Sequence, residues 1–391
     1  MDASDKNLPW GSLKGVRPVK LAYRKLKEGL TDEEITAFLM DKYNVSGEKA
    51  AFSVEIAKKE EKIIKDSSPE GYCLYIGIPF CPTRCMYCSF ASFPADACKE
   101  AISPYLDALF SEMEHCARLM KGKRINAVYI GGGTPTALPP KDFERLLEGV
   151  VRYFDTGSFP EYTCESGRPD SITAEHLHIM KEYGISRICI NPQSMNEKTL
   201  RRIGRFHTPD DVRDAFYMAR EQGFSNINMD IILGLPGEDE EDLKYTLEEI
   251  KSLSPDALTV HCLAVKRGSK LHEALEEYEP LSGQKARRHL ALSAEYARGM
   301  GMEPYYLYRQ KHMIGNLENT GWALPGKEGI YNVLTMEETC SIYAIGAGTV
   351  SKKVSYEDGF KAARCDTVKS PVEYAARIEE MKERKSILYG E

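Results

Sequence analysis

The sequence predicts an α/β fold built from repeated strand–helix units. Short apolar runs rich in β-branched and aromatic residues recur between residues 72 and 265, and amphipathic stretches of helical periodicity separate them. Glycines and polar residues follow the ends of these runs, which is where (β/α) barrels place their active sites. We therefore expect a partial (β/α)6 barrel of TIM type, with a small N-terminal helical segment and a C-terminal α+β domain that covers the open face. The alternative is an open doubly wound sheet.

Six strand–helix repeats are expected in the central region. The expected strands are 72–78, 125–131, 162–166, 187–191, 227–233 and 257–265. The expected helices between them are 101–121, 141–154, 173–184, 209–222 and 238–252. This alternation implies parallel strands joined by right-handed crossovers.

The flanking regions have other patterns. Residues 17 to about 65 are expected to be helical, and Thr31 and Glu34 have the spacing of a capping box. Beyond residue 270 we expect a helix, an aromatic segment, an apolar run and a last helix, at 283–299, 304–310, 341–348 and 371–388. The predicted parts are an N-terminal helical segment (1–70), the barrel (71–270) and a C-terminal covering domain (271–391).

Composition and charge exclude several classes of function. The chain has 391 residues, a net charge of −7 and a pI of about 5.8, which argues against a general nucleic-acid or membrane-surface binder. No apolar stretch approaches the roughly 20 residues that span a bilayer, and the start lacks the pattern of a signal peptide. We therefore expect a cytoplasmic protein with no nucleic-acid or membrane partner, whose eleven cysteines are reduced.

Three cysteines are crowded into the loop after the first expected strand. In "FCPTRCMYCSF" (80–90), Cys81, Cys85 and Cys88 have the spacing C-x3-C-x2-C. One such loop can bind three irons of a cuboidal iron–sulfur cluster and leave the fourth iron open, whereas ferredoxin-type clusters have four thiolate ligands. The alternative is zinc, with Cys73 or Cys98 completing a set of four.

The cysteine loop, with Tyr87 directly before its last cysteine, resembles the signature of radical S-adenosylmethionine (SAM) enzymes. In that family the amino and carboxylate groups of SAM chelate the open iron. An electron from the [4Fe–4S] cluster then cleaves SAM to methionine and a 5′-deoxyadenosyl radical, which takes a hydrogen atom from the substrate. The resemblance implies that Cys81, Cys85 and Cys88 bind the cluster and that SAM is the cofactor.

Further candidate residues follow later strands. "GGGTPT" (131–136) allows close backbone approach and can form an anion-binding nest. Glu165 ends the third strand and can accept hydrogen bonds from an ammonium or from ribose hydroxyls. Gln193 and Arg205 follow the fourth strand, and a guanidinium suits a carboxylate. Asp230 lies in an apolar strand and needs a partner; an internal salt bridge between Arg205 and Asp230 is the alternative.

Longer motifs are similar to oxygen-independent coproporphyrinogen III dehydrogenases and their HemN- and HemW-type relatives. These motifs are "YIGIPFCPTRCMYCSF", "GGGTPT", "NPQSMNEKTLRRIGRFHT" and "MDIILGLPGE". "LPWGSLKGVRP", "ESGRPDSIT" and "PYYLYRQKHMIGNLENTGW" resemble the HemZ-type branch most, so the resemblance covers essentially the whole chain. It implies SAM contacts at Tyr75, Tyr87, Gly132, Gly133, Thr134, Glu165, Gln193, Arg205, Asp230, Ala264 and Val350. Four of these would serve a second SAM, so one or two are expected: Gln193, Arg205, Asp230 and Ala264.

The chain departs from its relatives at two places. The well-studied dehydrogenases have another cysteine two positions after the third cluster cysteine, where this chain has Phe90 and looks more like the related haem chaperones. Those chaperones carry an adjacent His-Asn pair with a Tyr-Trp pair shortly after it. Here His312 is followed by Met313, and no Tyr-Trp pair is present.

The resemblance implies coproporphyrinogen III as the substrate. Hydrogen abstraction from the β-carbon of a propionate, followed by loss of CO2 and one electron, would leave a vinyl group, and two such events would give protoporphyrinogen IX. Candidate cationic anchors for this polyanion are Lys266, Arg267, Arg309 and Lys311, with surface charge as their alternative. Tyr305, Tyr306 and Tyr308 either line an apolar pocket or pack the C-terminal domain.

The expected partners are a reduced donor of the flavodoxin or ferredoxin type and the tetrapyrrole, and the chain is expected to be a monomer. Two other functions stay open. One is a haem chaperone or haem-trafficking protein that keeps the cluster and SAM site. The other is a different tetrapyrrole-acting radical SAM enzyme, such as a methyltransferase that opens haem.

Overall fold

The computed structural model describes residues 8–13, 17–266, 268–273, 281–310, 313–356 and 359–390. Contacts within the chain group the residues into two compact units, neither of which is a continuous stretch. The cysteine-loop unit comprises Ser67–Pro192, Gly204–Asn228 and Gly329–Glu391. The N-terminal unit comprises Met1–Asp66, Gln193–Ile203 and Met229–Glu328. The predicted division at residues 70 and 270 stays a prediction.

The cysteine-loop unit is built on a sheet with the strand order β13-β12-β11-β1-β4-β5-β6, and β6 pairs with the first two residues of β7. The strands are β1 (Tyr72–Ile78), β4 (Ile125–Gly132), β5 (Tyr162–Glu165), β6 (Arg187–Cys189), β7 (Ile227–Leu233), β11 (Ser341–Ile345), β12 (Val350–Ser355) and β13 (Lys361–Asp366). From β11 to β7 neighbouring strands are parallel, and β11, β12 and β13 are antiparallel. The strand order β1-β4-β5-β6-β7 follows the chain without the reversal that defines a doubly wound sheet, so that alternative is wrong.

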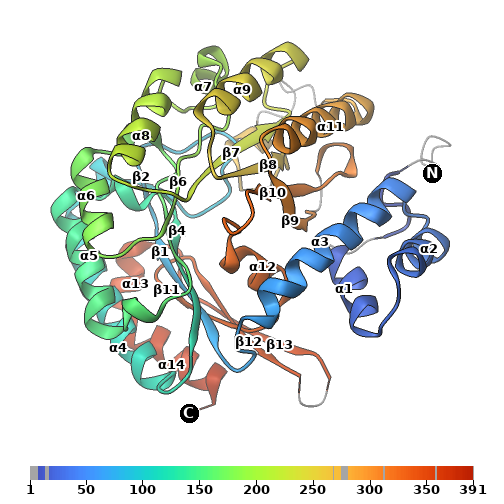
Figure 1. Cartoon of the computed structure of the whole chain (residues 1–391). Helices are drawn as coiled ribbons and strands as arrows, with labels where there is room; N and C mark the ends of the chain where they lie inside the picture. Colours follow the sequence, from blue (N-terminus) through green and yellow to red (C-terminus); the bar gives the residue numbers. More distant parts are fainter. Residues whose placement is uncertain are drawn as a thin grey trace. The chain divides into compact units, whose positions relative to one another are not determined.

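Helices separate the parallel strands as predicted. The crossover helices are α4 (Lys99–Leu119), α5 (Pro140–Tyr153), α6 (Ala174–Glu182) and α8 (Pro209–Glu221), and each contacts the next (Figure 1). The short 3-10 turns are η2 (Asp96–Cys98), η3 (Pro135–Ala137), η4 (Thr156–Ser158) and η5 (Pro169–Ser171). β1 is buried along almost its whole length, which is typical of a parallel strand covered on both faces.

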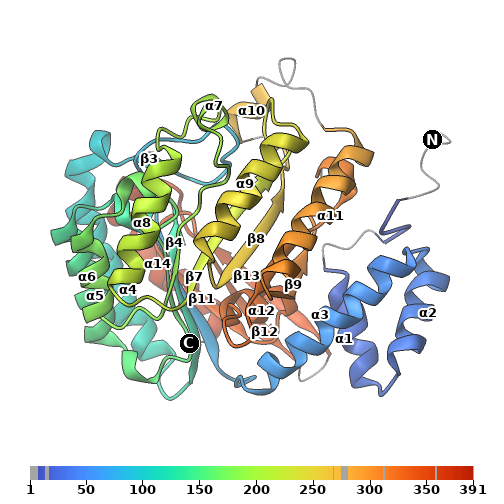
Figure 2. The same cartoon turned by 45° about the horizontal axis from the view of Figure 1, so that its top comes forward.

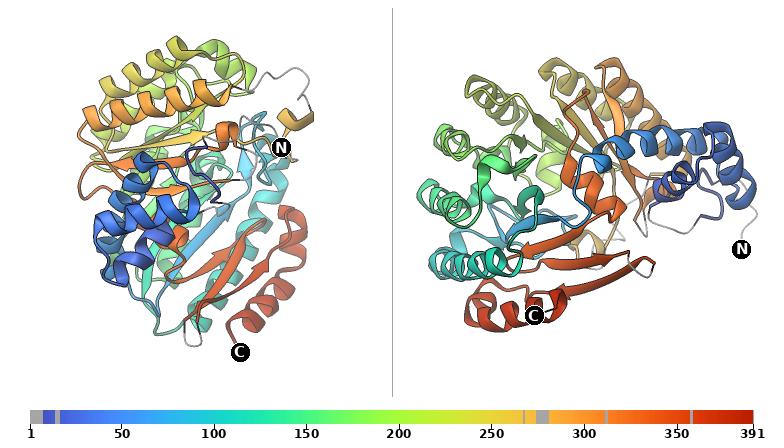
Figure 3. Two further views of the ribbon diagram at one scale, coloured as in Figure 1. Left: turned by 90° about the vertical axis from the view of Figure 1, so that its right-hand side faces the viewer. Right: turned by 60° about the horizontal axis from the view of Figure 1, so that its bottom comes forward.

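The last expected helix is two helices, because the chain breaks at Arg377 (φ −116°, ψ 26°). α13 (Pro371–Ala376) and α14 (Ile378–Tyr389) pack on α4, as Figure 3 shows for the red and teal segments. α12 (Ile330–Glu337) packs against β1 and β4. The buried carboxylate of Glu161 accepts hydrogen bonds from the first two backbone N–H groups of α12, at 2.6 and 3.2 Å.

The N-terminal unit holds the remaining elements. Its helices are α1 (Val19–Lys27), α2 (Asp32–Tyr43), α3 (Gly47–Lys65), α7 (Glu197–Arg202), α9 (Glu240–Leu253), α10 (Lys270–Glu273), α11 (Gly283–Gly299) and the turn η7 (Ile314–Asn316). From Met229 on, β7 is followed in the sheet by β8 (Ala257–Cys262), β10 (Asn319–Ala323) and β9 (Glu303–Tyr308), and β8, β10 and β9 are antiparallel. α9 and α11 lie side by side (Figure 2).

A capping box and an apolar cluster stabilise the N-terminal helices. Both hydrogen bonds of the predicted capping box are present between Thr31 and Glu34. Trp10, Ile35 and Leu307 are buried in one apolar cluster, which fixes α2 and β9 in the same core. Among the described residues no helix is both long enough and apolar enough to cross a bilayer.

A fully buried ion pair fastens α14 to the cysteine-loop unit. Lys385 of α14 contacts Glu112 of α4, and neither side chain is exposed. Lys385 Nζ also donates to Ala344 O at 2.5 Å, and Glu112 accepts from Gly346 N at 2.9 Å and from the hydroxyl of Tyr374. Because both charges are desolvated, removing one leaves the other uncompensated.

We predict that Lys385→Met lowers the free energy of unfolding by about 3–5 kcal/mol, because Glu112 then stays buried without its cation. Lys382→Met is the control on the same helix; it removes a surface pair with Glu379 and should cost less than about 1 kcal/mol. Urea denaturation followed by circular dichroism measures both. Equal losses for the two variants would contradict the role of the buried pair.

Candidate active site

The cysteine loop is closed at its base by a short parallel pair of strands. β2 (Phe80–Cys81) pairs with β3 (Phe93–Pro94), and Ala95 N donates to Cys81 O at 2.9 Å. Cys85 is buried, whereas Cys81 and Cys88 are partly exposed. Burial raises the pKa of the Cys81 thiol to about 12, so binding a metal there must displace a proton.

The glycine segment after β4 is bonded directly to the chain that leads into this loop. Gly133 N donates to Ile78 O and Thr134 N to Phe80 O, both at 2.7 Å. Thr134 Oγ1 lies 3.6 Å from Cys81 Sγ. A Cβ on Gly133 would stand 2.4 Å from Phe80 O and 3.0 Å from Cys81 Sγ, so only glycine fits without a shift.

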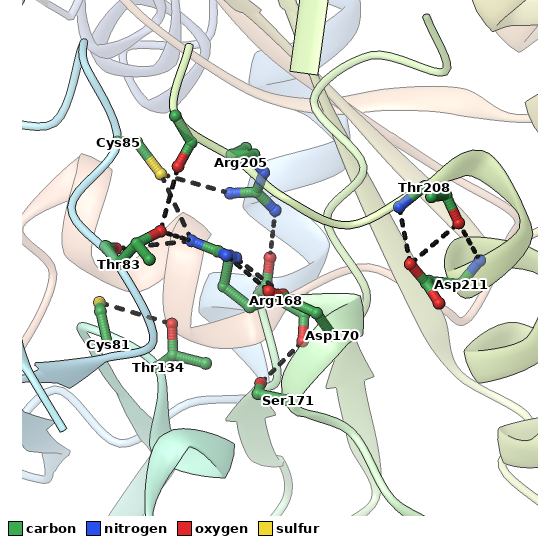
Figure 4. A network of polar contacts seen from close by, with 12 residues as sticks. Cys81, Thr83, Cys85, Thr134, Arg168, Asp170, Ser171, Arg205, Thr208 and Asp211 are labelled. Atoms are coloured by element: carbon green, nitrogen blue, oxygen red, sulfur yellow. Dashed lines mark hydrogen bonds and ion pairs between the residues drawn. The ribbon is translucent and has the colours of Figure 1, made fainter. Parts of the chain in front are cut away.

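Arg168 contacts two residues of the cysteine loop, Thr83 and Cys85 (Figure 4). Its buried guanidinium makes a two-pronged ion pair with Asp170, at 2.9 and 2.6 Å. Its Nη1 donates to Thr83 Oγ1 at 2.9 Å and lies 3.9 Å from Cys85 Sγ. Burial alone would raise the pKa of Asp170, but the hydrogen bonds and charge of Arg168 outweigh it, so the pKa of Asp170 is lowered.

Arg205 approaches Cys85 with a second buried guanidinium (Figure 4). Its Nη2 donates to Gly167 O at 2.7 Å and to Asn191 O at 2.5 Å. Its Nη1 lies 3.9 Å from Cys85 Sγ and 3.4 Å from the hydroxyl of Tyr87. The guanidinium groups of Arg168 and Arg205 therefore both lie beside Cys85, one of the three predicted cluster ligands.

His207 is a buried neutral imidazole. Neither of its ring nitrogens has a hydrogen-bond partner among the described residues. Burial, and then the positive charge of Arg205, lower the pKa of His207 to about 3.

A recess of about 190 Å³ opens within the same unit. Three predicted cofactor residues line it: Tyr75, Gly132 and Val350. Phe90, which stands where the dehydrogenases carry a further cysteine, also lines it and is 65% exposed. Tyr75 stacks on Tyr129 and on Tyr331, with ring centroids 6.0 and 6.1 Å apart.

Glu165 lies at the end of β5 against the glycine segment. A Cβ on Gly131 would be 2.6 Å from Glu165 Oε2, so the carboxylate occupies the space that this glycine leaves. Burial, and then the charge of Glu165, raise the pKa of Tyr75. The predicted residues of the cysteine-loop unit thus include the three cysteines, the glycine segment, Glu165 and Arg205.

Three other predicted residues belong to the N-terminal unit. Gln193 has a left-handed backbone (φ 66°), its N–H donates to Asp230 O at 2.9 Å, and its Oε1 has no partner in the described structure. Ala264 forms an isolated antiparallel bridge with Met313. The left-handed backbone of Gln193 is strained for a non-glycine residue, and strain of this kind is common at functional sites.

Asp230 has a partner that the sequence did not suggest. His261 Nε2 lies 3.5 Å from Asp230 Oδ2, and His261 Nδ1 lies 3.4 Å from the hydroxyl of Tyr308. Arg205, which lies in the cysteine-loop unit, donates to the carbonyls of Gly167 and Asn191, and the alternative of a salt bridge between Arg205 and Asp230 stays a prediction. The roles in cofactor binding that the resemblance implied stay predictions.

The candidate cationic anchors have different surroundings. Arg309 is buried and donates to Leu13 O at 2.7 Å and to Asn316 Oδ1 at 2.5 Å, so it holds the N-terminal unit together. Lys266 is exposed. Arg267 and Lys311, as well as His312, lie outside the described residues. Tyr305 and Tyr306 are buried in the packing of β9.

Arg168, His207 and His261 were missed as site residues. A signal existed for Arg168, which comes three positions after Glu165 in "ESGRPDSIT". His261 is the penultimate residue of β8, which neighbours the strand of Asp230 in the sheet, and only the strand order shows this.

The residues of the loop fit an iron–sulfur cluster better than a single metal ion. In the part of the chain that the structure describes, no three His, Cys, Asp or Glu side chains converge on a point that one ion could occupy. A cluster has a separate iron for each thiolate, so its ligands need not meet at one point. Cys73, the possible fourth zinc ligand, is buried with its Sγ 3.6 Å from Cys340 Sγ.

Comparison with known proteins decides the family. Residues 75–250 match the family model described as the radical SAM superfamily. The oxygen-independent coproporphyrinogen-III oxidase-like protein HemZ of Bacillus subtilis (strain 168) is 38% identical over 381 residues, or 96% of this chain and 76% of that protein. The chain belongs to the radical SAM superfamily, in this oxidase-like family.

Other relatives carry two different names. The haem chaperone HemW of Bacillus subtilis is 31% identical over 70% of this chain and 69% of its own. The oxygen-independent coproporphyrinogen III oxidase of Escherichia coli (strain K12) is 30% identical over 57% of this chain and 50% of its own. The family resemblance expected from the motifs is therefore confirmed, and the radical SAM cofactors, a [4Fe–4S] cluster and SAM, apply to this chain.

A solved structure shows the same fold. The coproporphyrinogen III oxidase HemN of Escherichia coli, described as a radical SAM enzyme, matches with a TM-score of 0.64 and 22% identity over 84% of this chain and 77% of its own. With the alternation of parallel strands and helices, this likeness confirms the predicted fold class of a radical SAM α/β partial barrel.

We predict that Gly133→Ala lowers the iron and sulfide content of this radical SAM protein after anaerobic reconstitution. The added Cβ would press on Phe80 O and Cys81 Sγ, and overpacking costs about 1–3 kcal/mol. Gly157→Ala is the control, because its nearest neighbour, Asp155 Oδ1, would be 3.5 Å away. Unchanged iron in Gly133→Ala would contradict the close fit between the glycine segment and the loop.

We predict that His207 contributes to acid sensitivity. Its folded pKa of about 3 is below the unfolded value of about 6.5, so the unfolded chain binds the extra proton and stability falls as pH drops below 6.5. His207→Gln should reduce the loss of unfolding free energy between about pH 7 and pH 5 by about 2 kcal/mol. His178→Gln, at an exposed histidine on α6, should leave that loss unchanged. Identical pH profiles for wild type and His207→Gln would refute the assignment.

Proposed function

We propose that this radical SAM protein oxidatively decarboxylates two propionates of coproporphyrinogen III to vinyl groups, giving protoporphyrinogen IX in haem biosynthesis without oxygen. The observation that carries the proposal is the three-cysteine loop beside a tyrosine- and glycine-lined recess, in a chain whose 38% identical relative is named for this oxidase activity. The polyanionic substrate is consistent with the name of the Escherichia coli relative.

Different residues of the cysteine-loop unit would bind the cluster and SAM. Cys81, Cys85 and Cys88 would hold the cluster, with Arg168 and Arg205 stabilising the loop around Cys85. The glycine segment and Glu165 would receive the methionine end of SAM, and Tyr75 and Val350 would line its recess. Bound together, the cluster and SAM supply the 5′-deoxyadenosyl radical.

The chemistry balances without a base. A hydrogen atom leaves the β-carbon of the propionate, CO2 leaves as the C–C bond breaks, and one electron passes to an acceptor. Residues that exclude water from the recess protect the carbon radical from side reactions.

Gln193, Asp230 and Ala264 would bind a second SAM in the N-terminal unit. A reduced flavodoxin- or ferredoxin-type protein would supply the electron, and we propose a cytoplasmic monomer.

The second candidate is a haem chaperone that keeps the cluster and the SAM site. The haem chaperone HemW relative and Phe90, in the position of a cysteine of the dehydrogenases, favour it. A methyltransferase-like reaction on haem remains a third outcome that product mass distinguishes.

The test is an anaerobic turnover assay with reconstituted protein, dithionite, SAM and coproporphyrinogen III, followed by mass spectrometry of the porphyrin. We expect product that has lost two carboxyl groups, together with 5′-deoxyadenosine. Cys85→Ala should abolish both, whereas Cys365→Ala, at a partly exposed cysteine on β13, should not. Stable haem binding without vinyl product would favour the chaperone.

A further inference from the structure

A second, larger cavity lies in the N-terminal unit and holds none of the cluster cysteines. Its volume is about 910 Å³, within the range of small-molecule and cofactor sites. Residues of α3 form one wall, residues of α11 form the other, and the floor includes Trp322 of β10. We call this cavity the α3–α11 groove.

The α11 wall has two arginines with small residues between them. Arg287, Ala291, Ala294 and Arg298 are spaced i, i+4, i+7 and i+11, so they share one face of the helix. At 1.5 Å per residue the two arginines are about 16 Å apart along the helix axis. The two alanines leave the space between them open. Such a wall suits an elongated ligand with acidic groups near its ends.

The floor of the groove is aromatic and apolar. The rings of Phe52 and Trp322 lie 5.8 Å apart, and the guanidinium of Arg298 lies 5.2 Å from the Trp322 ring. Leu290 and Leu317 complete the apolar lining. Trp322 is only 2% exposed, so a flat ring system in the groove would pack mainly on the partly exposed Phe52.

The carboxylates that face the groove are already neutralised. The buried Glu318 pairs with Lys49 at 2.6 Å and accepts from the indole of Trp10 at 2.7 Å. Glu55 pairs with Arg298 at 2.9 Å, and Glu48 lies 3.8 Å from Lys49.

One further arginine of α11, Arg288, lines the groove at the end away from Arg298. Arg287 and Arg288 are exposed, and Arg288 reaches Glu240 of α9 at 2.8 Å. The charges that line the groove are four cations, Lys49, Arg287, Arg288 and Arg298, and three carboxylates, Glu48, Glu55 and Glu318, in a chain of net charge −7. Because Glu240 offsets the charge of Arg288, the groove is close to neutral overall, and a ligand carboxylate would have to engage the exposed guanidinium groups of α11 directly.

We propose that the α3–α11 groove binds a flat ring system carrying carboxylates, and specifically a second tetrapyrrole molecule. The size, the aromatic floor and the arginines of one wall together select this ligand class. The choice of a tetrapyrrole rests on the proposed function. The groove then holds substrate before, or product after, its passage through the radical site.

The test is a titration of the anaerobically reconstituted protein with coproporphyrin III, the stable oxidised form, without SAM or reductant. The porphyrin absorption band and the tryptophan emission report binding, since the only two tryptophans are Trp322 in the floor and Trp10 beside Glu318. We expect Arg287→Glu/Arg288→Glu and, separately, Ala291→Phe to weaken this binding at least about tenfold. These positions are exposed, so folding should be preserved, which circular dichroism checks.

Arg152→Glu on α5, an exposed arginine that does not line the groove, is the matched charge-reversal control and should bind like wild type. Wild-type affinity and stoichiometry in both groove variants would overturn the proposal. So would sedimentation showing that the groove instead joins two copies of the chain, with Ala291→Phe monomeric and wild type dimeric.

The binding assay and the turnover assay fail separately. If vinyl product forms but groove variants bind coproporphyrin normally, the groove assignment is wrong and the proposed function stands. If groove variants lose binding but no product ever forms, the groove assignment stands and the decarboxylase activity is wrong.

Discussion

The cysteine loop depends on two buried guanidinium groups that meet at Cys85. Burying a guanidinium is costly unless its donors are satisfied. Arg168 satisfies this need through Asp170 and Thr83, and Arg205 through the carbonyls of Gly167 and Asn191. The carbonyl groups follow β5 and β6, so the arginines tie the loop after β1 to the ends of two other strands.

The recess next to the loop is made by close backbone approach. β1 and β4 are parallel neighbours with an unbroken register from Cys73 to Ile78, and the glycines that end β4 let the two backbones hydrogen-bond beyond the last paired residues. Side chains at Gly131 or Gly133 would collide with Glu165 or with Cys81. The absence of a side chain at Gly131 therefore leaves space for the Glu165 carboxylate, and its absence at Gly133 leaves space for the Cys81 thiol.

The sequence located most of the secondary structure because periodicity is local. β1 and β7 have the expected bounds, α11 also does, and the capping box of α2 is present. The expected helix 371–388 is broken into two helices, because Arg377 leaves helical geometry inside a stretch whose apolar spacing continues. Partners of charged side chains could not be predicted in the same way. His261 contacts Asp230 because β8 neighbours β7 in the sheet, and no pattern in the sequence predicts this pair.

The sequence by itself determined the alternation of strands and helices, the three-cysteine spacing and the family, because each depends on residues that are near neighbours in the chain. Only the tertiary structure decided that β11 pairs with β1, that Arg168 and Arg205 converge on Cys85, and that α3 and α11 enclose a groove lined by arginines. Each of these joins segments far apart in sequence. Their contacts are selected by packing and desolvation in the folded chain, which no local pattern records.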